Sequence, residues 1–284
     1  MPGGNFEFIL LNATDPWTEV DGERSSIQTK HPVLSDPAVR AAINMLIDRA
    51  SVQKYVYGRG GIATANCINN PARYRSPNTS FEFSIAKANE LLDGAGWKKG
   101  ASGIREKDGK QLKLVFQTSI NAPRQKNQAI IKQACQKAGI DVELKSVVAS
   151  VFFSSDVANP DTYTHFYCDM QMYQTTMPQA DPQFFMNQFT SWECATKENK
   201  WQGRNVCRWQ NKDYDETYKL AQSELDPVKR AALFIKLNDL VVRDNYVLPE
   251  INRLNAIGVK NGMVLYKSGW DNDLAFIASW YRAS

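Results

Sequence analysis

The chain has 284 residues, of which 43% are hydrophobic and 23% are charged, a balance typical of a globular protein with a full core. Its formal net charge of +4 comes from basic residues that are mixed with acidic ones, which argues against a nucleic-acid-binding surface. No apolar run approaches the roughly 20 residues that a membrane-spanning helix needs.

A strand is predicted close to the beginning of the chain. Its apolar residues, which predict a position inside the body of a domain, are Phe6, Phe8, Ile9, Leu10 and Leu11. A secretory signal would need a positively charged region, an apolar core and a small-residue cleavage site, and this pattern does not precede the strand. We therefore expect the chain to begin part-way through a longer protein.

Two amphipathic helices are predicted next. Asp36 can cap the first helix and Pro37 suits its first turn, while a following cluster of glycines ends it. Its apolar stripe consists of Val39, Ile43, Leu46, Ile47 and Ala50. The second helix begins at Ser84 and stops at Gly94 and Gly96, because glycine permits a left-handed turn.

The middle of the chain predicts a βαβ unit. Apolar and polar residues alternate at residues 112–116 and 140–144, as in strands, and residues 125–138 between them have helical spacing. A further strand is predicted at residues 166–172, and its apolar side carries Phe166, Cys168, Met170 and Met172. We expect the other side to face outward, with His165, Tyr167, Asp169, Gln171 and Tyr173.

The last part of the chain predicts more helix than strand. A proline-rich turn leads to a short helix from about Asp181, which is followed by a long loop at residues 191–211. Two helices are then predicted at residues 213–224 and 226–242, and closing strands follow them.

Several segments, taken in order, resemble one protein family. They are SDPAVRAAINMLIDR (residues 35–49), AKANELLDGAGW (86–97), GIREKDGKQLKL (103–114), KAGIDVEL (137–144), the Asp181-Pro182 step, RWQNKDYD (208–215) and LDPVKRAALFIKLNDLV (225–241). Together they make the chain resemble the extracellular solute-binding proteins of the oligopeptide, dipeptide and nickel class of ABC importers. The resemblance implies an α/β fold of the periplasmic-binding-protein type, in the large two-lobed type II class, with a mixed sheet flanked by helices.

The resemblance also implies how the chain is organised. Such proteins have two lobes with a cleft between them, and this chain resembles their C-terminal portion, with one lobe and part of the other. Residues 1–12 would be a strand entering from the absent first lobe, residues 13–246 the α/β substrate-binding lobe, and residues 247–284 closing strands that cross back. It further implies a monomer in the periplasm or at the cell exterior, an ABC permease and ATPase complex as partner, and no cofactor.

The five cysteines lack any CxxC pair, so a metal site is not expected. Cys135 and Cys168 fall on the apolar sides of a predicted helix and strand, and they are predicted to be buried thiols. Cys194 and Cys207 flank a polar loop and could form a disulfide in an oxidising compartment.

The sequence gives no positive sign of an enzyme. The chain has two histidines, His31 and His165, and neither lies in a nucleophile motif, so we expect both to be exposed or locally hydrogen-bonded. The glycine-rich stretches lack the Lys-Ser/Thr pair of a phosphate-binding loop. We therefore expect no catalytic site.

A ligand-binding site is predicted where strands end, because ligands of α/β sheets gather beyond the carboxyl ends of strands. The candidate residues are Asn66, Cys67, Asn121, Arg124, Tyr173, Gln174, Thr175, Thr176, Asp181, Trp209 and Trp270. Structural alternatives remain open for all of them. Asn121 is also a suitable helix cap, Arg124 a surface cation and Asp181 a helix start. The asparagine-rich stretch around Asn66 can simply form turns. Tyr173 and Gln174 can be sheet-edge residues, and Trp209 and Trp270 can pack in the core.

One departure from the family pattern narrows the choice of solute. Peptide-binding relatives carry an aspartate shortly before the Asp-Pro step, where it pairs with the ammonium group of the peptide. Here that position is Pro178, and residues 175–180 are uncharged. Since an unpaired buried ammonium costs several kcal/mol, our hypothesis is a peptide-like, opine-like or oligosaccharide solute bound without that anchor. A ligand-sensing or protein-interaction module on the same fold is the alternative function.

Overall fold

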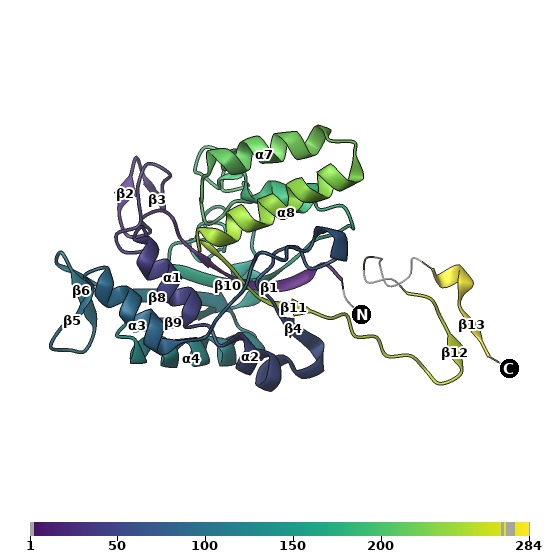
Figure 1. Ribbon diagram of the computed structural model, residues 1–284, viewed down its shortest axis with the longest axis horizontal. Coiled ribbons are helices and arrows are strands. Elements are labelled where there is room, and N and C mark those ends of the chain that lie inside the picture. Colours follow the sequence, from purple (N-terminus) through teal and green to yellow (C-terminus); the bar gives the residue numbers. More distant parts are fainter. Residues whose placement is uncertain (1–2, 268–269, 271–275, 284) are drawn as a thin grey trace.

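The computed structural model describes residues 3–267, 270 and 276–283. Its centre is a six-stranded mixed sheet with the strand order β4-β11-β1-β10-β8-β9, and helices cover both faces of the sheet (Figure 1). The six strands are β1 (Asn5–Leu11), β4 (Gly61–Ala63), β8 (Lys113–Ser119), β9 (Asp141–Val147), β10 (Met170–Thr176) and β11 (Val247–Arg253). This is the α/β class with a mixed sheet that the sequence predicts.

The strand directions bring four carboxyl ends to one edge of the sheet. β10 is parallel to β8 and β8 is parallel to β9, whereas β1 is antiparallel to both of its neighbours, β10 and β11. β8, β9, β10 and β11 therefore all end at the edge where β1 begins. The predicted βαβ unit is confirmed as β8, α4 and β9.

The α-helices lie on opposite faces of the sheet (Figure 1). They are α1 (Pro37–Met45), α2 (Arg49–Val52), α3 (Ile85–Gly94), α4 (Ala122–Lys137), α5 (Ala149–Phe152), α6 (Gln183–Met186), α7 (Lys212–Ser223) and α8 (Pro227–Arg243). One core cluster joins the sheet to α7 and α8, and the other joins it to α1, α3 and α4. Within the described residues, no helix has the length and apolar character that crossing a bilayer requires.

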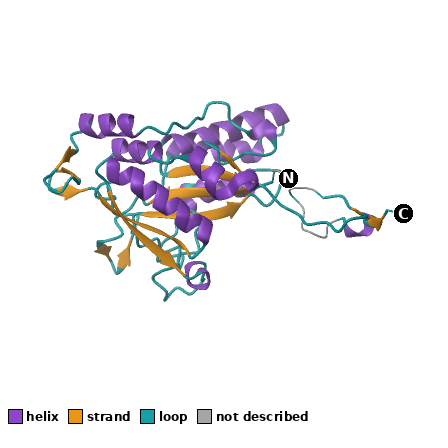
Figure 2. Ribbon diagram, turned by 90° about the horizontal axis from the view of Figure 1, so that it is seen from below, coloured by secondary structure: helices purple, strands orange, loops and turns teal. Residues whose placement is uncertain are grey.

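Short elements connect these helices and strands. The small strands are β2 (Glu19–Val20), β3 (Glu23–Arg24), β5 (Lys98–Lys99), β6 (Arg105–Lys107), β7 (Lys110–Gln111), β12 (Met263–Val264) and β13 (Tyr281–Arg282). A π-helix spans Gln53–Tyr57, and 3-10 turns span Gly58–Gly60, Ala72–Tyr74, Asn187–Phe189, Ser191–Glu193 and Ile277–Ser279. Beyond β11 the chain runs outward from the sheet, and β12 pairs with β13 there (Figure 2).

The first strand of the chain lies inside the six-stranded sheet. β1 sits between β10 and β11, so the predicted strand near the beginning of the chain is confirmed as a buried central strand. The division of the chain into lobes at residues 12 and 246 stays a prediction.

The first amphipathic helix is shorter than predicted. Asp36 caps it as expected, with its carboxylate accepting from Ala38 N at 2.9 Å, but the helix ends at Met45. The chain then leaves the helical path, and Asp48 starts a second helix by accepting from Ser51 N at 3.0 Å. The prediction of one continuous helix is wrong because Asp48 supplies a second N-cap inside the apolar stripe.

The strand predicted at residues 166–172 begins later and is buried on both sides. Phe166 adopts a positive φ of 52°, which is incompatible with a strand, and β10 starts at Met170. Asp169, Gln171 and Tyr173 were expected to face outward but are buried. That expectation is wrong because helices cover both faces of this sheet, so alternation along the strand does not separate core from solvent.

The disulfide considered between Cys194 and Cys207 is absent, and both residues are free buried thiols. Each sulfur has a different polar neighbour, Gln210 Nε2 at 3.8 Å from Cys194 and Asn205 Oδ1 at 3.5 Å from Cys207. Burial raises the pKa of the Cys194 thiol to about 12 and that of Cys207 to about 11, so both resist forming the reactive thiolate. Cys135 and Cys168 are confirmed as buried thiols.

Candidate functional site

The last four residues of β10 lie at the edge of the sheet where the strands end. Their side chains alternate in direction. Tyr173 and Thr175 line a pocket on the face that carries α7 and α8. Gln174 and Thr176 instead donate to the side chain of Asn5 at the start of β1, at 3.2 and 2.6 Å. This part of the predicted site therefore contains two different surfaces.

The pocket beside Tyr173, which we call the strand-end pocket, has a volume of about 150 Å³. It is lined by Tyr163, Thr164, Tyr173, Thr175, Gln188, Trp201, Gln202, Gly203 and Arg204. The rings of Tyr163 and Tyr173 lie 5.1 Å apart. Burial raises the pKa of both tyrosines, so their phenols remain neutral at physiological pH. The walls combine aromatic faces with neutral polar groups and one guanidinium.

β10 extends past one of its two neighbours at this pocket. It pairs with β1 from Met170 to Thr176, but its register with β8 stops at Met172. Residues 174–176 therefore present one backbone edge without a strand partner among the described residues. Such an edge offers alternating N–H and C=O groups to an extended chain.

The loop at residues 191–211 folds tightly against itself and carries the other wall of the pocket. Asn205 N donates to Glu193 O at 2.8 Å, and its side-chain amide bonds to the carbonyls of Thr190 and Trp209 at 3.0 and 2.7 Å. Gly203 lies so close to this turn that a Cβ would be 2.3 Å from Glu193 O. The loop thus holds its pocket-lining residues in fixed positions.

Arg124, in the first turn of α4, is paired with Glu7 of β1, which lies opposite Gln174 in the sheet. Its Nε and Nη2 are 3.1 and 3.2 Å from the two carboxylate oxygens of Glu7, and its Nη1 donates to Ser119 Oγ at 2.8 Å. Arg253 also contacts Glu7, at 3.2 Å, and donates to Gln174. Arg124 is 7% exposed, so the surface-cation alternative is wrong, and its charge already has a protein partner.

Asn121 and Asp181 both have structural roles. Asn121 caps α4, since its Oδ1 accepts from Arg124 N at 3.3 Å. Asp181 accepts from Gln183 N at 2.9 Å where α6 begins, and its two oxygens lie 3.0 and 2.9 Å from Arg230 Nη2. The helix-cap and helix-start alternatives are confirmed. Asp181 also lines a separate polar pocket of about 380 Å³ beside α7 and α8.

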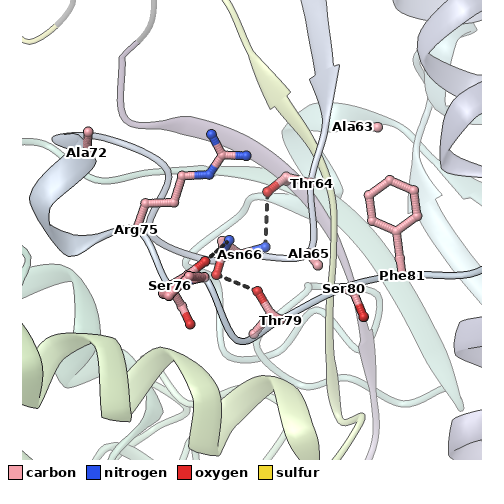
Figure 3. Close-up of a pocket in the computed structure, with 11 residues that line it drawn as sticks. Ala63, Thr64, Ala65, Asn66, Ala72, Arg75, Ser76, Thr79, Ser80 and Phe81 are labelled. Atoms are coloured by element: carbon pink, nitrogen blue, oxygen red, sulfur yellow. Dashed lines mark hydrogen bonds between the residues drawn. The ribbon is translucent and has the colours of Figure 1, made fainter.

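Asn66 and Cys67 lie on the loop after β4, which shares no residue with the strand-end pocket. Asn66 donates to Ser76 O at 3.1 Å and accepts from Thr79 Oγ1 at 2.8 Å, which closes the loop around a hollow of about 520 Å³ (Figure 3). Cys67 is buried below it, and its N–H donates to Asn238 Oδ1 of α8 at 2.8 Å.

This loop pocket is formed by one stretch of chain. All its lining residues lie between positions 63 and 81, and the guanidinium of Arg75 extends over it toward Thr64 (Figure 3). The strand-end pocket instead combines the end of β10 with three separate segments of the chain, at residues 163–164, 188 and 201–204. We therefore take the strand-end pocket, with the free edge of β10, as the principal candidate site.

Trp209 and Trp270 do not line the strand-end pocket. Trp209 is 2% exposed and its Nε1 donates to Asp244 Oδ2 at 3.0 Å, which confirms its core-packing alternative. Trp270 is half-buried and packs against the same core cluster.

The two histidines are buried and hydrogen-bonded. His31 Nδ1 accepts from Val33 N and Leu34 N, so Nε2 carries the proton and donates to Asp169 Oδ1 at 2.8 Å. Both ring nitrogens are thereby occupied, and His31 cannot act as a base toward a nucleophile. His165 Nδ1 lies 2.8 Å from Thr162 Oγ1, and burial lowers the pKa of its imidazole. The described residues contain no group of three or more potential metal ligands.

Comparison with known proteins identifies the family. The profile of the bacterial extracellular solute-binding proteins, family 5 Middle, matches residues 1–197. The chain belongs to this family. The oligopeptide-binding protein AppA of Bacillus subtilis is 24% identical over 302 residues, which cover 100% of this chain and 53% of AppA. This family 5 chain therefore spans about half the length of that relative.

Solved structures show the same family fold. An oligopeptide-binding protein from Thermus thermophilus, complexed with a pentapeptide, is 23% identical with a TM-score of 0.76, covering 93% of this chain and 44% of that one. NikZ from Campylobacter jejuni, in complex with Ni(L-His), is 18% identical with a TM-score of 0.71, covering 89% and 46%. The resemblance inferred from the sequence is thus confirmed, both for the family and for its fold.

Seven of the nine residues that line the strand-end pocket of this family 5 chain were not predicted from its sequence. Among them, Tyr163, Trp201 and Arg204 lie in irregular segments without hydrophobic periodicity. For Trp201 and Arg204, the length of the loop at residues 191–211 was an available signal, because loops longer than about 12–15 residues are often functional.

Proposed function

We propose that this chain forms part of the substrate-binding component of an ABC importer and that it binds a peptide-like solute at the end of β10. The observation that carries the proposal is the free backbone edge at residues 174–176, which lies beside the strand-end pocket. An extended solute can bond to that edge while one of its substituents enters the pocket.

The relatives support this proposal through what their names state. AppA is an oligopeptide-binding protein, and a second Bacillus subtilis relative is the dipeptide-binding protein DppE. A crystal structure of AppA contains a nonapeptide. By analogy, the protein would act without catalysis as a monomer, in the periplasm or at the cell exterior, and deliver its solute to a membrane permease driven by an ATPase.

The strand edge favours a peptide-like solute over the other two solute classes. A peptide supplies N–H and C=O groups at the spacing of a β-strand, so it can continue the sheet. An oligosaccharide or opine-like molecule can bond to single main-chain groups, but it lacks N–H and C=O groups repeated at strand spacing. Among the three classes, the peptide is the one that can pair with the successive main-chain groups of residues 174–176 as a strand does.

The proposal can be tested by two-dimensional 15N NMR of the chain with the capped tripeptide Ac-Ala-Ala-Ala-NH2 at millimolar concentration. We expect the largest shifts in the amides of residues 173–176 and 201–204. In a Thr175→Trp variant the indole would fill the pocket, and these shifts should disappear. Gln179→Trp places the same ring beside the other pocket and should preserve them. Shifts confined to the loop at residues 63–81, or no shifts at all, would contradict the proposal.

A further inference from the structure

The strand-end pocket is large enough for one group of a solute but too small for a whole one. Its volume of about 150 Å³ lies well below the roughly 300–1,000 Å³ of pockets that enclose small molecules. The pocket therefore acts as a subsite for a single substituent, and the chemistry of its walls selects that substituent.

Arg204 gives this subsite its charge. Among the described lining residues, Arg204 is the one ionised side chain, and the others are aromatic, hydroxyl, amide or glycine. Its guanidinium lies 4.4 Å from the ring centroid of Phe184, and its Nη1 donates to Phe184 O at 2.8 Å. The backbone of the same residue is held by Glu193, whose Oε2 accepts from Arg204 N at 3.4 Å. The cation is thus positioned by contacts that leave most of its five N–H donors available.

The guanidinium of Arg204 forms no ion pair with a carboxylate among the described residues. Four other arginines do so: Arg105, Arg124, Arg230 and Arg253. Asp181 binds Arg230 instead, and the two oxygens of Glu193 accept from Asn187 Nδ2 at 2.7 Å and from the backbone N of Arg204 at 3.4 Å. A partly buried cation without a counter-charge favours an anionic ligand.

The field of Arg204 reaches the pocket interior. Burial raises the pKa of the Tyr163 and Tyr173 phenols, and the positive charge of Arg204 opposes that rise at both residues. The turn that follows β10 offers no compensating acid, since residues 175–180 are uncharged. The subsite is therefore electropositive, and the described residues that line it include no carboxylate that would bind an ammonium.

We propose that the strand-end pocket binds a carboxylate of the solute through Arg204, so that the protein selects acidic peptide-like solutes. This inference rests on the proposed function, because the peptide must first lie along the edge of β10. The carboxylate can come from an acidic side chain or from the carboxyl terminus of the peptide, and both would pair with the planar guanidinium in the same way.

Three capped peptides of equal length separate these sources. Ac-Ala-Glu-Ala-NH2 carries a side-chain carboxylate, Ac-Ala-Ala-Ala-OH carries a terminal one, and Ac-Ala-Gln-Ala-NH2 carries no charge. NMR titration of the chain should show at least one acidic peptide binding about tenfold or more tightly than the glutamine peptide. The acidic peptide that binds more tightly identifies the source of the carboxylate.

Two variants that each lose one positive charge test whether Arg204 causes the preference for acidic peptides. Arg204→Gln should abolish the preference for acidic peptides, whereas Lys229→Gln, on the exposed first turn of α8, should leave it intact. The preference of the unmodified chain should also weaken as salt rises from about 0.02 to about 0.5 M. This second measurement does not depend on the folding of a variant.

The outcomes distinguish this inference from the proposed function. Equal binding of all three peptides, unaffected by salt and by Arg204→Gln, would overturn the carboxylate subsite and leave peptide binding standing. A preference that survives in Arg204→Gln would assign it to another residue and also overturn the inference. If none of the three peptides binds at millimolar concentration, both proposals are wrong.

Discussion

At the scale of single residues, Glu7 and Arg124 form the best-shielded ion pair in the described chain. The side chain of Glu7 is 1% exposed and that of Arg124 is 9% exposed, and the carboxylate receives two hydrogen bonds from the guanidinium. Such a pair need not stabilise a fold more than apolar residues of the same shape would. Removal of one partner is nevertheless costly, because the other charge stays buried without compensation.

We therefore expect Arg124→Met to lower the free energy of unfolding by up to about 3 kcal/mol, since the buried Glu7 then keeps a single cationic partner, the partly exposed Arg253 at 3.2 Å. Lys145→Met is the matched control. Lys145 and Asp161 form an ion pair at 2.6 Å whose side chains are 38% and 42% exposed, so its loss should cost about 1 kcal/mol or less. Urea denaturation of both variants measures the difference. Equal losses would show that burial of the Glu7 pair has no energetic consequence.

Glu250 is a second buried carboxylate whose protonation should make stability depend on pH. Burial raises its pKa from an ordinary value of 4.5 to about 7, although Arg49 and a hydrogen bond from Asn127 at 2.6 Å act in the opposite direction. The folded state therefore holds this proton more tightly than the unfolded chain does. Its contribution to stability is present below about pH 4.5 and is lost as the pH rises to about 7.

Because the pKa of Glu250 is higher in the folded state, its loss of the proton should lower the free energy of unfolding by roughly 3 kcal/mol between about pH 5 and pH 8. Glu250→Gln should flatten that part of the profile, because glutamine has no proton to lose. Glu143→Gln, which changes an exposed carboxylate on β9, should leave the profile unchanged. Urea midpoints across this pH range provide the measurement, and a slope that persists in Glu250→Gln would assign it to other groups.

At the scale of elements, two glycines illustrate how a loop and a helix differ in what they tolerate. Gly203 lies in the loop that walls the strand-end pocket, where a Cβ would be 2.3 Å from Glu193 O and 2.5 Å from Cys194 O. Gly94 lies in the last turn of α3, where a Cβ would meet nothing within 4 Å. The same added methyl group should therefore have opposite effects at the two positions.

Gly203→Ala should lower the free energy of unfolding by about 1–3 kcal/mol, because the loop must open to admit the methyl group. It should also weaken peptide binding, since Arg204 would shift with the loop. Gly94→Ala should instead raise stability by up to about 1 kcal/mol through helix propensity alone. Thermal unfolding and peptide titration of both variants test this, and a neutral Gly203→Ala would show that the loop packing is loose.

At the scale of the whole molecule, the sequence predicted those elements whose evidence is local. Caps at Asp36 and Ser84, the βαβ unit and the last two helices depend on residues within a few positions of one another, and all are present. The predictions that were wrong depend on packing between residues far apart in the sequence. The outer side of β10 is buried because helices from other parts of the chain cover it, which alternation along one strand does not reveal.

In the candidate site, too, features that depend on local sequence were predicted and features that depend on distant contacts were not. The strand end at Tyr173 and Thr175 was predicted, because the position of a strand end is a local property. The roles of Arg124 and Arg204 were not, since they depend on partners that the sequence does not place nearby. Arg124 and Glu7 are 117 positions apart, and Arg204 lines a pocket whose two tyrosines, Tyr163 and Tyr173, precede it by about 30 to 40 residues.

The position of β1 between β10 and β11 has a consequence for how the chain reaches its native state. Glu7 and Arg253, in contact across this sheet, are separated by 246 residues, so the middle of the sheet cannot assemble until nearly all of the chain has been synthesised. Contacts of such long range make folding slow and expose partly assembled intermediates. Until β10 and β11 have been synthesised, β1 therefore has unpaired edges that chaperones can engage.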